Sequence, residues 1–238
     1  MRRSRGPFPP FPFPLSRMGL LLLVAAGGTI ALLFAVSVFA AYHRQFSLAR
    51  RLSWGGGAVA AVYVAALAAT NLSAAPRVLS PGQDLRFCGF YLDCHLAAAV
   101  EDTRVVDSLG TPPFQATPGG AFWVVTVRIS SNARRAVLQL GDPQAFVVDT
   151  RGQRYPPSTL AATALRALGV SAPGLDQPVA AGGAYTTSLI FDLPRNMGRF
   201  VLHIRDGWIV DRAIESLLFG DDDGWLRPHP AFALSARQ

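Results

Sequence analysis

The sequence predicts a mainly β protein whose N-terminal third crosses a membrane. Two uncharged apolar runs cover residues 18–42 and 54–75, and each reaches the roughly 20 residues that a helix needs to span a bilayer. From about residue 85, short stretches of alternating apolar and polar residues are separated by Gly, Pro, Asp and Asn. Such alternation is typical of antiparallel strands with one buried face.

The basic residues are concentrated in the membrane third. The 238-residue chain has a formal net charge of +7, a balance that would suit a nucleic-acid-binding protein. However, residues 1–83 hold eight Arg and no acidic residue, whereas residues 84–238 hold 14 Arg and 15 acidic residues. Arg beside apolar spans is typical of membrane topology, and the remaining domain has no excess charge for phosphates. We therefore expect the lipid bilayer, and no nucleic acid, as a partner.

The first 53 residues predict a tail, a span and a connector. Residues 1–17 combine Arg with Pro and Phe, which predicts a disordered tail, with a Pro-rich ligand as the alternative. The run over 18–42 exceeds the roughly 7 to 15 apolar residues of a signal peptide, so it predicts a transmembrane helix. The Arg-containing connector over 43–53 favours the cytoplasm and places the large domain outside it. The four Arg of the tail oppose this orientation, unless Met18 and not Met1 initiates the chain.

Residues 54–75 predict a second transmembrane helix, and residues 76–84 a linker. The second run is rich in Gly and Ala, which suits close helix contact. Three alanines recur at intervals of four residues. The alternative is that this spacing only reflects how common Ala is in the sequence. We expect them to pack on small residues of the first helix, Ala61, Ala65 and Ala69 against Gly27, Gly28 and Ala31.

Residues 85–206 carry the strand pattern. The clearest strand is 122–130, which we expect to be central with one side in the core, because four apolar residues share one face, namely Trp123, Val125, Val127 and Ile129. Further strands are predicted over 136–140, 146–149, 185–192 and 200–205, with a hairpin turn at Asp149–Gly152. A short helix is predicted over 158–168, with Ser158 as its N-cap and Gly169 as its end.

Together with the cysteine-containing region, the segment through Val106 and the return strand that begins at Arg154 and Tyr155, this makes roughly seven strands in about 130 residues. That number and spacing predict an immunoglobulin-like antiparallel β-sandwich with a short helical insert, and a small barrel is the alternative. Within residues 207–238, apolar residues at helical spacing after Trp208 predict a short amphipathic helix, followed by a tail.

Residues 85–206 also resemble a known family. The order FWVVTVRISSNARRA, FVVDTRGQRY, PVAAGGAYTTSLIFDLP and FVLHIRDG is similar to the telokin-like immunoglobulin-fold family of unknown function, found on bacterial secreted lipoproteins and membrane proteins. The matching positions are turn and packing residues, Asn132, Asp149 with Gly152, Gly182 with Gly183, and Phe191–Pro194. The resemblance implies this fold and an extracytoplasmic address, and it supplies no catalytic residues.

The two cysteines, Cys88 and Cys94, lie close together in the sequence, and His95 follows directly. Covalent haem attachment needs C-x-x-C-H, which this spacing excludes. A zinc site would have to recruit His203 and His229 from distant segments. In an exported domain the pair most simply forms a disulfide, which would contribute about 2 kcal/mol by closing a short loop.

The same stretch holds three aromatic residues, Phe87, Phe90 and Tyr91. If displayed on the surface, they form the binding surface that the sequence favours. The acidic cluster Asp221, Asp222 and Asp223 lacks the alternating ligand spacing of a calcium loop, so a solvated turn is favoured over a cation site.

No nucleophile elbow, P-loop, dinucleotide-binding or zinc-protease motif occurs in the sequence. We therefore expect no enzyme, no cofactor and no metal, and a membrane-anchored extracytoplasmic domain that binds a protein or ligand of the cell envelope. A structural accessory subunit of a membrane complex, acting through its transmembrane helices, is the first alternative. An enzyme or metal-binding protein that uses His95 or the acidic cluster is the second.

Overall fold

The computed structural model describes residues 15–87, 94–112, 115–167, 169, 172–195, 199–206, 217 and 228–235. The chain divides into two compact units. One comprises residues 1–74 with 215–227, and the other comprises residues 75–214 with 228–238. The first unit is built on a helical hairpin and the second on two β-sheets, so the predicted change from apolar helices to strands is confirmed.

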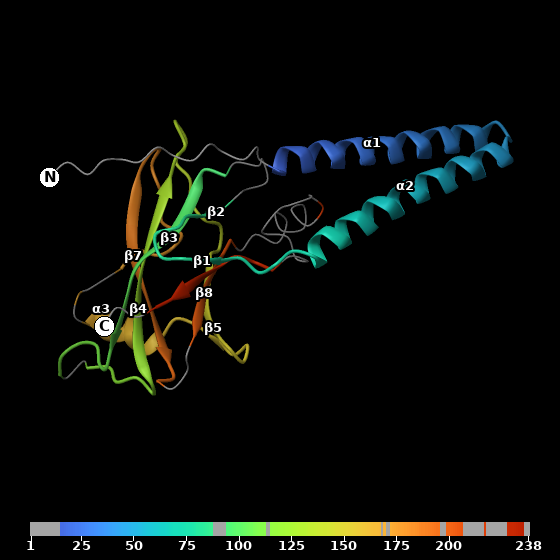
Figure 1. Cartoon of the computed structure of the whole chain (residues 1–238). Coiled ribbons are helices and arrows are strands. Elements are labelled where there is room, and N and C mark those ends of the chain that lie inside the picture. Colours follow the sequence, from blue (N-terminus) through green and yellow to red (C-terminus); the bar gives the residue numbers. More distant parts are fainter. Residues whose placement is uncertain are drawn as a thin grey trace. The chain divides into compact units, whose positions relative to one another are not determined.

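The helical unit contains α1 (Leu15–Tyr42) and α2 (Phe46–Leu72), which run antiparallel (Figure 1). Both helices are long and apolar enough to cross a membrane. Most of the predicted connector is helical, since residues 43–45 separate the two helices and Arg50 and Arg51 lie within α2. Arg is a good helix former, and no Pro or Gly interrupts residues 46–53, so helix formation continues through the polar stretch.

The two helices meet through a different row of small residues from the one predicted. Ser37 donates its hydroxyl to the Ala49 carbonyl at 2.9 Å and lies 2.8 Å from the Ser53 hydroxyl. A Cβ on Gly56 would lie 3.7 Å from Leu33. By contrast, the predicted contact residues are exposed or open, Ala61, Ala65 and Ala69 on α2 and Gly27 and Gly28 on α1. The Ser37 face is favoured because it satisfies hydroxyl groups within an apolar surface.

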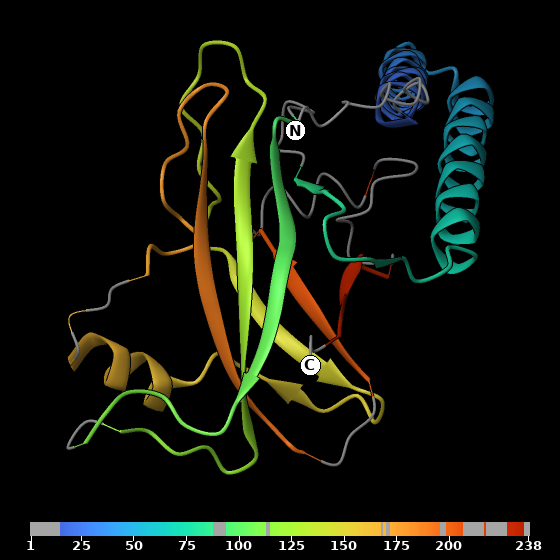
Figure 2. The same ribbon diagram turned by 60° about the vertical axis from the view of Figure 1, so that its left-hand side comes forward.

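The β unit consists of two sheets (Figure 2). The first is fully antiparallel, in the order β2 (Leu85–Phe87), β3 (Leu96–Val106), β4 (Ala121–Ser131) and β7 (Ala184–Leu193). The second has the order β1 (Val78–Leu79), β9 (Ala231–Leu234), β8 (Phe200–Arg205), β5 (Gln144–Asp149) and β6 (Arg154–Tyr155). Its β1 and β9 are parallel and its other pairs antiparallel.

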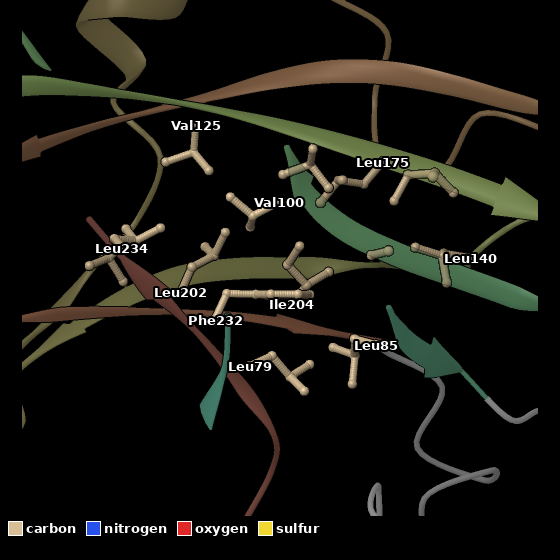
Figure 3. Close-up of a cluster of buried hydrophobic side chains, with 14 of the residues drawn as sticks. Leu79, Leu85, Val100, Val125, Leu140, Leu175, Leu202, Ile204, Phe232 and Leu234 are labelled. Atoms are coloured by element: carbon tan, nitrogen blue, oxygen red, sulfur yellow. The ribbon is translucent and has the colours of Figure 1, made fainter. Parts of the chain in front are cut away.

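The main core lies between these sheets. Figure 3 shows Val100 and Val125 of the first sheet facing Leu202 and Phe232 of the second. The predicted central strand is confirmed, because β4 lies between β3 and β7 and buries Val125, Val127 and Ile129. Each sheet therefore contributes one apolar face, as the alternating pattern predicted.

Strand β9 was not predicted. The sequence predicts only a helix and a tail over residues 207–238, but Ala231–Leu234 pairs with β1 on one side and β8 on the other, and Phe232 is fully buried. Four residues are too few to show periodicity on their own, so the strand is defined by its neighbours. The predicted amphipathic helix falls on residues that, apart from Leu217, are outside the described ones.

The strand predicted over residues 136–140 does not form. Only Leu138 pairs there, in an isolated bridge with Val179. Leu140 is nevertheless buried, so the alternation reports burial of a loop against the core. Asp142 has a φ of 46° and turns the chain before a longer ladder can develop.

The predicted helical insert is confirmed as α3 (Thr159–Ala167). The Ser158 hydroxyl accepts the backbone N–H of Ala161 at 3.3 Å and caps the helix. Gly169, with a φ of 72°, follows its last turn. Helix α3 buries Ala161 and Ala164 against Phe122 and Ile190, on the outer face of the first sheet.

Candidate functional site

The stretch that holds both cysteines is described only in part. Cys94 is described and is not a free cysteine, whereas Cys88, Phe90 and Tyr91 lie outside the described residues. The disulfide therefore stays a prediction. Phe87 is 4% exposed and belongs to the main core, so it does not meet the condition of surface display under which it would form part of a binding surface. It is buried because it pairs with Leu96 across β2 and β3 with its side chain toward the second sheet.

His95, just before β3, is hydrogen-bonded to Asn132, just after β4. Its Nδ1 lies 2.5 Å from the Asn132 Oδ1, and its carbonyl accepts the Asn132 backbone N–H at 3.0 Å. These two bonds hold the register of the longest strand pair and account for both residues structurally. Among the described residues, no group of three or more His, Cys, Asp and Glu side chains forms a metal site. The cluster at residues 221–223 lies outside them.

A groove beside β7 is the candidate binding site. It has a volume of about 220 Å³ and lies between α3 and the segment 172–175, with Thr187–Ile190 of β7 along its floor. Figure 2 shows α3, in gold, beside β7, in orange. The groove exists because α3 is anchored at its N-terminus, where the Ser158 backbone N–H donates to the Ile190 carbonyl at 2.7 Å.

The opposite wall of the groove is held by side chains of β7. The Tyr185 hydroxyl donates to the Gly174 and Leu175 carbonyls at 3.0 and 2.9 Å. The Thr187 hydroxyl donates to the Pro173 carbonyl at 2.5 Å. Thr187 is buried, so this polar group is satisfied by the wall that it positions.

The groove is apolar on both walls and carries one charged residue. Leu165 and Leu175 contribute aliphatic surface, and Ser158 and Ser188 contribute hydroxyls. Arg166 lies at the end of α3, is exposed, and is the one charged side chain among the described lining residues. The described lining thus offers apolar surface, hydroxyl groups and a guanidinium.

A second group of side chains gathers on the outer face of the other sheet. His203 stacks on Phe146 at a centroid distance of 5.1 Å, and the guanidinium groups of Arg154 and Arg205 lie 5.0 and 5.2 Å from the Phe146 centroid. Burial, with the positive charges of Arg205 and Arg154 and the nearby His229 side chain, lowers the pKa of His203 to about 4. His203 is therefore neutral at pH 7 and packs as an aromatic ring, while both Arg make cation–π contacts.

Sequence reasoning missed both the groove and this aromatic group. Alternation along β8 places His203 on the face opposite Leu202 and Ile204. It did not show that Phe146 is its partner, because the register of β5 on β8 joins segments more than 50 residues apart. For the groove, the one local signal is the Ser158 cap, which predicts where α3 begins but not the strand that it packs against.

The sequence matches no protein-family profile and no curated protein. Three solved structures resemble about half of the chain. They are a conserved hypothetical protein from Bacillus anthracis (12% identity, TM-score 0.39, 54% of this chain and 91% of that one), the yjhA protein from Bacillus subtilis (13%, 0.36, 53% and 80%), and the secreted protein MPT63 from Mycobacterium tuberculosis (14%, 0.37, 55% and 92%). Similarity at this level assigns neither a family nor a function.

Proposed function

We propose that the chain is a non-catalytic, membrane-anchored protein whose β unit lies outside the cytoplasm and binds another protein of the cell envelope. The observation that carries this proposal is the groove between α3 and β7. It combines aliphatic walls, hydroxyl groups and the single charge of Arg166. A mostly apolar lining with a few polar groups is typical of binding sites.

We also propose that the β unit is an immunoglobulin-like sandwich of the telokin-like type. Two features favour this. The two sheets share one core, and the turn residues of the resemblance have structural roles. Asp192 is an example, because its carboxylate accepts the backbone N–H groups of Gly119 and Gly120 at 2.7 and 3.0 Å and ties a loop to β7.

The proposed location of the β unit outside the cytoplasm rests on the positions of the Arg residues near the helical turn. Arg44, Arg50 and Arg51 lie at the turn of the hairpin and at the start of α2. Retaining them in the cytoplasm places both other helix ends on the outer side. A disulfide between Cys88 and Cys94 suits the oxidising environment there.

Site-specific photo-crosslinking in intact cells tests the binding role. A photoreactive residue replaces Ser188 in the groove, Arg135 on an exposed loop of the same unit, or Ala65 on the exposed face of α2. We expect one defined product from position 188 and none from position 135. Products from position 65 alone would instead support the accessory-subunit alternative, in which the helices are the working surface.

Thiol labelling tests the address. Cells are treated with a membrane-impermeant reductant and then with a membrane-impermeant maleimide, which can react only with Cys88 and Cys94 because the chain has no other cysteine. We expect labelling of intact cells, and only after reduction. Labelling that requires cell lysis would place the β unit in the cytoplasm and remove the basis for the disulfide.

A further inference from the structure

We infer that the open edge of β7 pairs with an extended segment of a partner protein, which adds as a strand beside Thr186 and Ser188 and places an acidic side chain at Arg166. This inference rests on the proposed binding function and specifies its ligand. Strand β7 is the last strand of the first sheet, and within the described residues only β4 pairs with it. Its other edge carries the peptide groups that face away from β4.

Two hydrogen bonds show which peptide groups those are. The Ile190 carbonyl accepts the Ser158 backbone N–H at 2.7 Å, so the peptide groups of Ile190 point away from β4. The Gly183 carbonyl accepts the backbone N–H of Ser131, the last residue of β4, at 2.9 Å, so Gly183 points toward β4. Since the direction alternates along a strand, Thr186 and Ser188 point outward with Ile190.

The outward groups of Thr186 and Ser188 are accessible. Both residues are exposed, and within the described part of the chain no backbone or side-chain group outside the sheet is hydrogen-bonded to their peptide groups. At Ile190 the edge is closed by Ser158. The open length therefore matches a short added strand of about four residues, since each edge residue offers one donor and one acceptor.

The groove supplies the side-chain contacts that such a strand needs. Its volume of about 220 Å³ is below the roughly 300 to 1,000 Å³ of sites for drug-sized molecules, and it suits one or two side chains. The aliphatic walls at Leu165 and Leu175 fit an apolar side chain. Arg166, the only charged residue in the described lining, fits a carboxylate, with which a guanidinium forms paired hydrogen bonds.

Exposed strand edges are usually protected by a charge, a Pro or a bulge that faces the edge. In β7, the register with β4 runs without a bulge from Ala121 to Ser130, and the outward residues Thr186 and Ser188 carry small neutral side chains. Nothing on this stretch opposes pairing with another strand. The unprotected edge of β7 and the adjacent groove thus suit one ligand, an extended peptide.

The test uses full-length protein in lipid nanodiscs and a phage-displayed library of random 12-residue peptides. We expect enrichment of peptides with β-branched residues and an Asp or Glu. The variant Arg166→Glu should weaken the selected peptide at least tenfold, whereas Arg135→Glu, an exposed loop Arg in the same unit, should not. The variant Ser188→Pro should weaken it similarly, because it removes an outward N–H and no bond to β4.

N-methylation of the selected peptide distinguishes strand addition from groove binding alone. Methyl groups on every second peptide nitrogen should abolish binding in one register and preserve it in the other, because only alternate N–H groups face β7. The absence of enrichment, equal binding to all variants, or equal effects of both methylation registers would overturn the inference. So would a dimer of the chain that Ser188→Pro dissociates. A crosslink from position 188 in cells would still support the proposed function.

Discussion

The Tyr155 hydroxyl of β6 donates to the Asp149 carboxylate of β5 at 3.1 Å. The same carboxylate accepts the backbone N–H groups of Arg151 and Gln153 at 2.8 and 2.9 Å, and the Asp149 carbonyl accepts the N–H of Gly152, whose φ is 82°. One buried side chain thus closes the hairpin and ties it to the strand beyond. Burial would raise the pKa of Asp149, but the hydrogen bonds from Gln153, Arg151 and Tyr155 outweigh it and lower the pKa.

Replacing Asp149 with Asn should destabilise the β unit most at neutral pH. A carboxyl whose folded pKa lies below its ordinary value of 3.8 stabilises the fold above that pH, and the contribution is lost as pH falls through the folded pKa. The difference in free energy of unfolding between wild type and Asp149→Asn should therefore narrow between about pH 7 and pH 3. Urea unfolding of both full-length proteins in detergent, at several pH values, measures this difference in free energy. Asp142→Asn, at an exposed loop residue, is the control, and a constant difference would contradict the prediction.

His203 should cause a second, distinct pH dependence of the free energy of unfolding. Its folded pKa of about 4 lies below the ordinary 6.5, so between these values the unfolded chain binds a proton that the folded chain does not. The free energy of unfolding should therefore fall as the pH is lowered through this window, by at most about 2 kcal/mol after solvent screening. His203→Gln should remove this part of the pH dependence, measured as urea unfolding at about pH 7.5 and pH 5. An equal change in the free energy of unfolding with pH in the wild type and in His203→Gln would show that His203 does not control this pH dependence.

Gly120 should not tolerate a side chain, whereas its neighbour Gly119 should. A Cβ on Gly120 would overlap the carbonyl group of Leu193, while one on Gly119 would lie 3.6 Å from the Asp192 carboxylate, an ordinary contact. We expect Gly120→Ala to lose about 2 to 4 kcal/mol of stability, because backbone must move. Gly119→Ala should stay within about 0.5 kcal/mol of wild type. Thermal unfolding of the two variants checks the contrast, and similar melting temperatures would argue against the close approach of this loop to β7.

Phe232 should be as important as any residue of the central strands, although it lies six positions before Gln238. Its side chain is fully buried between the sheets, so Phe232→Ala should cost about 3 to 5 kcal/mol. Val137→Ala, at a loop residue that is 64% exposed, should change stability by less than about 0.5 kcal/mol. Urea unfolding compares the two variants. A neutral Phe232→Ala would mean that residues 231–234 behave as a tail.

Local features were predictable from the sequence. An uncharged run of 25 residues can satisfy its backbone in a membrane only as a helix, and the alternation around Val125 and Val127 can bury apolar residues only as a strand. The turn after Asp149 and the cap at Ser158 were also predictable, because Asp and Ser bond to backbone N–H groups within a few residues of themselves.

The sequence by itself determined which segments are helices and strands wherever a period extends over enough residues, as in 18–42, 122–130 and 200–205. Only the tertiary structure decided what each segment packs against. It placed residues 231–234 between β1 and β8, buried Phe87, turned Ala65 of α2 away from α1 and set α3 beside the open edge of β7. These outcomes depend on pairings between residues far apart in the chain, whose energies are sums over many contacts and leave no periodic trace in either partner.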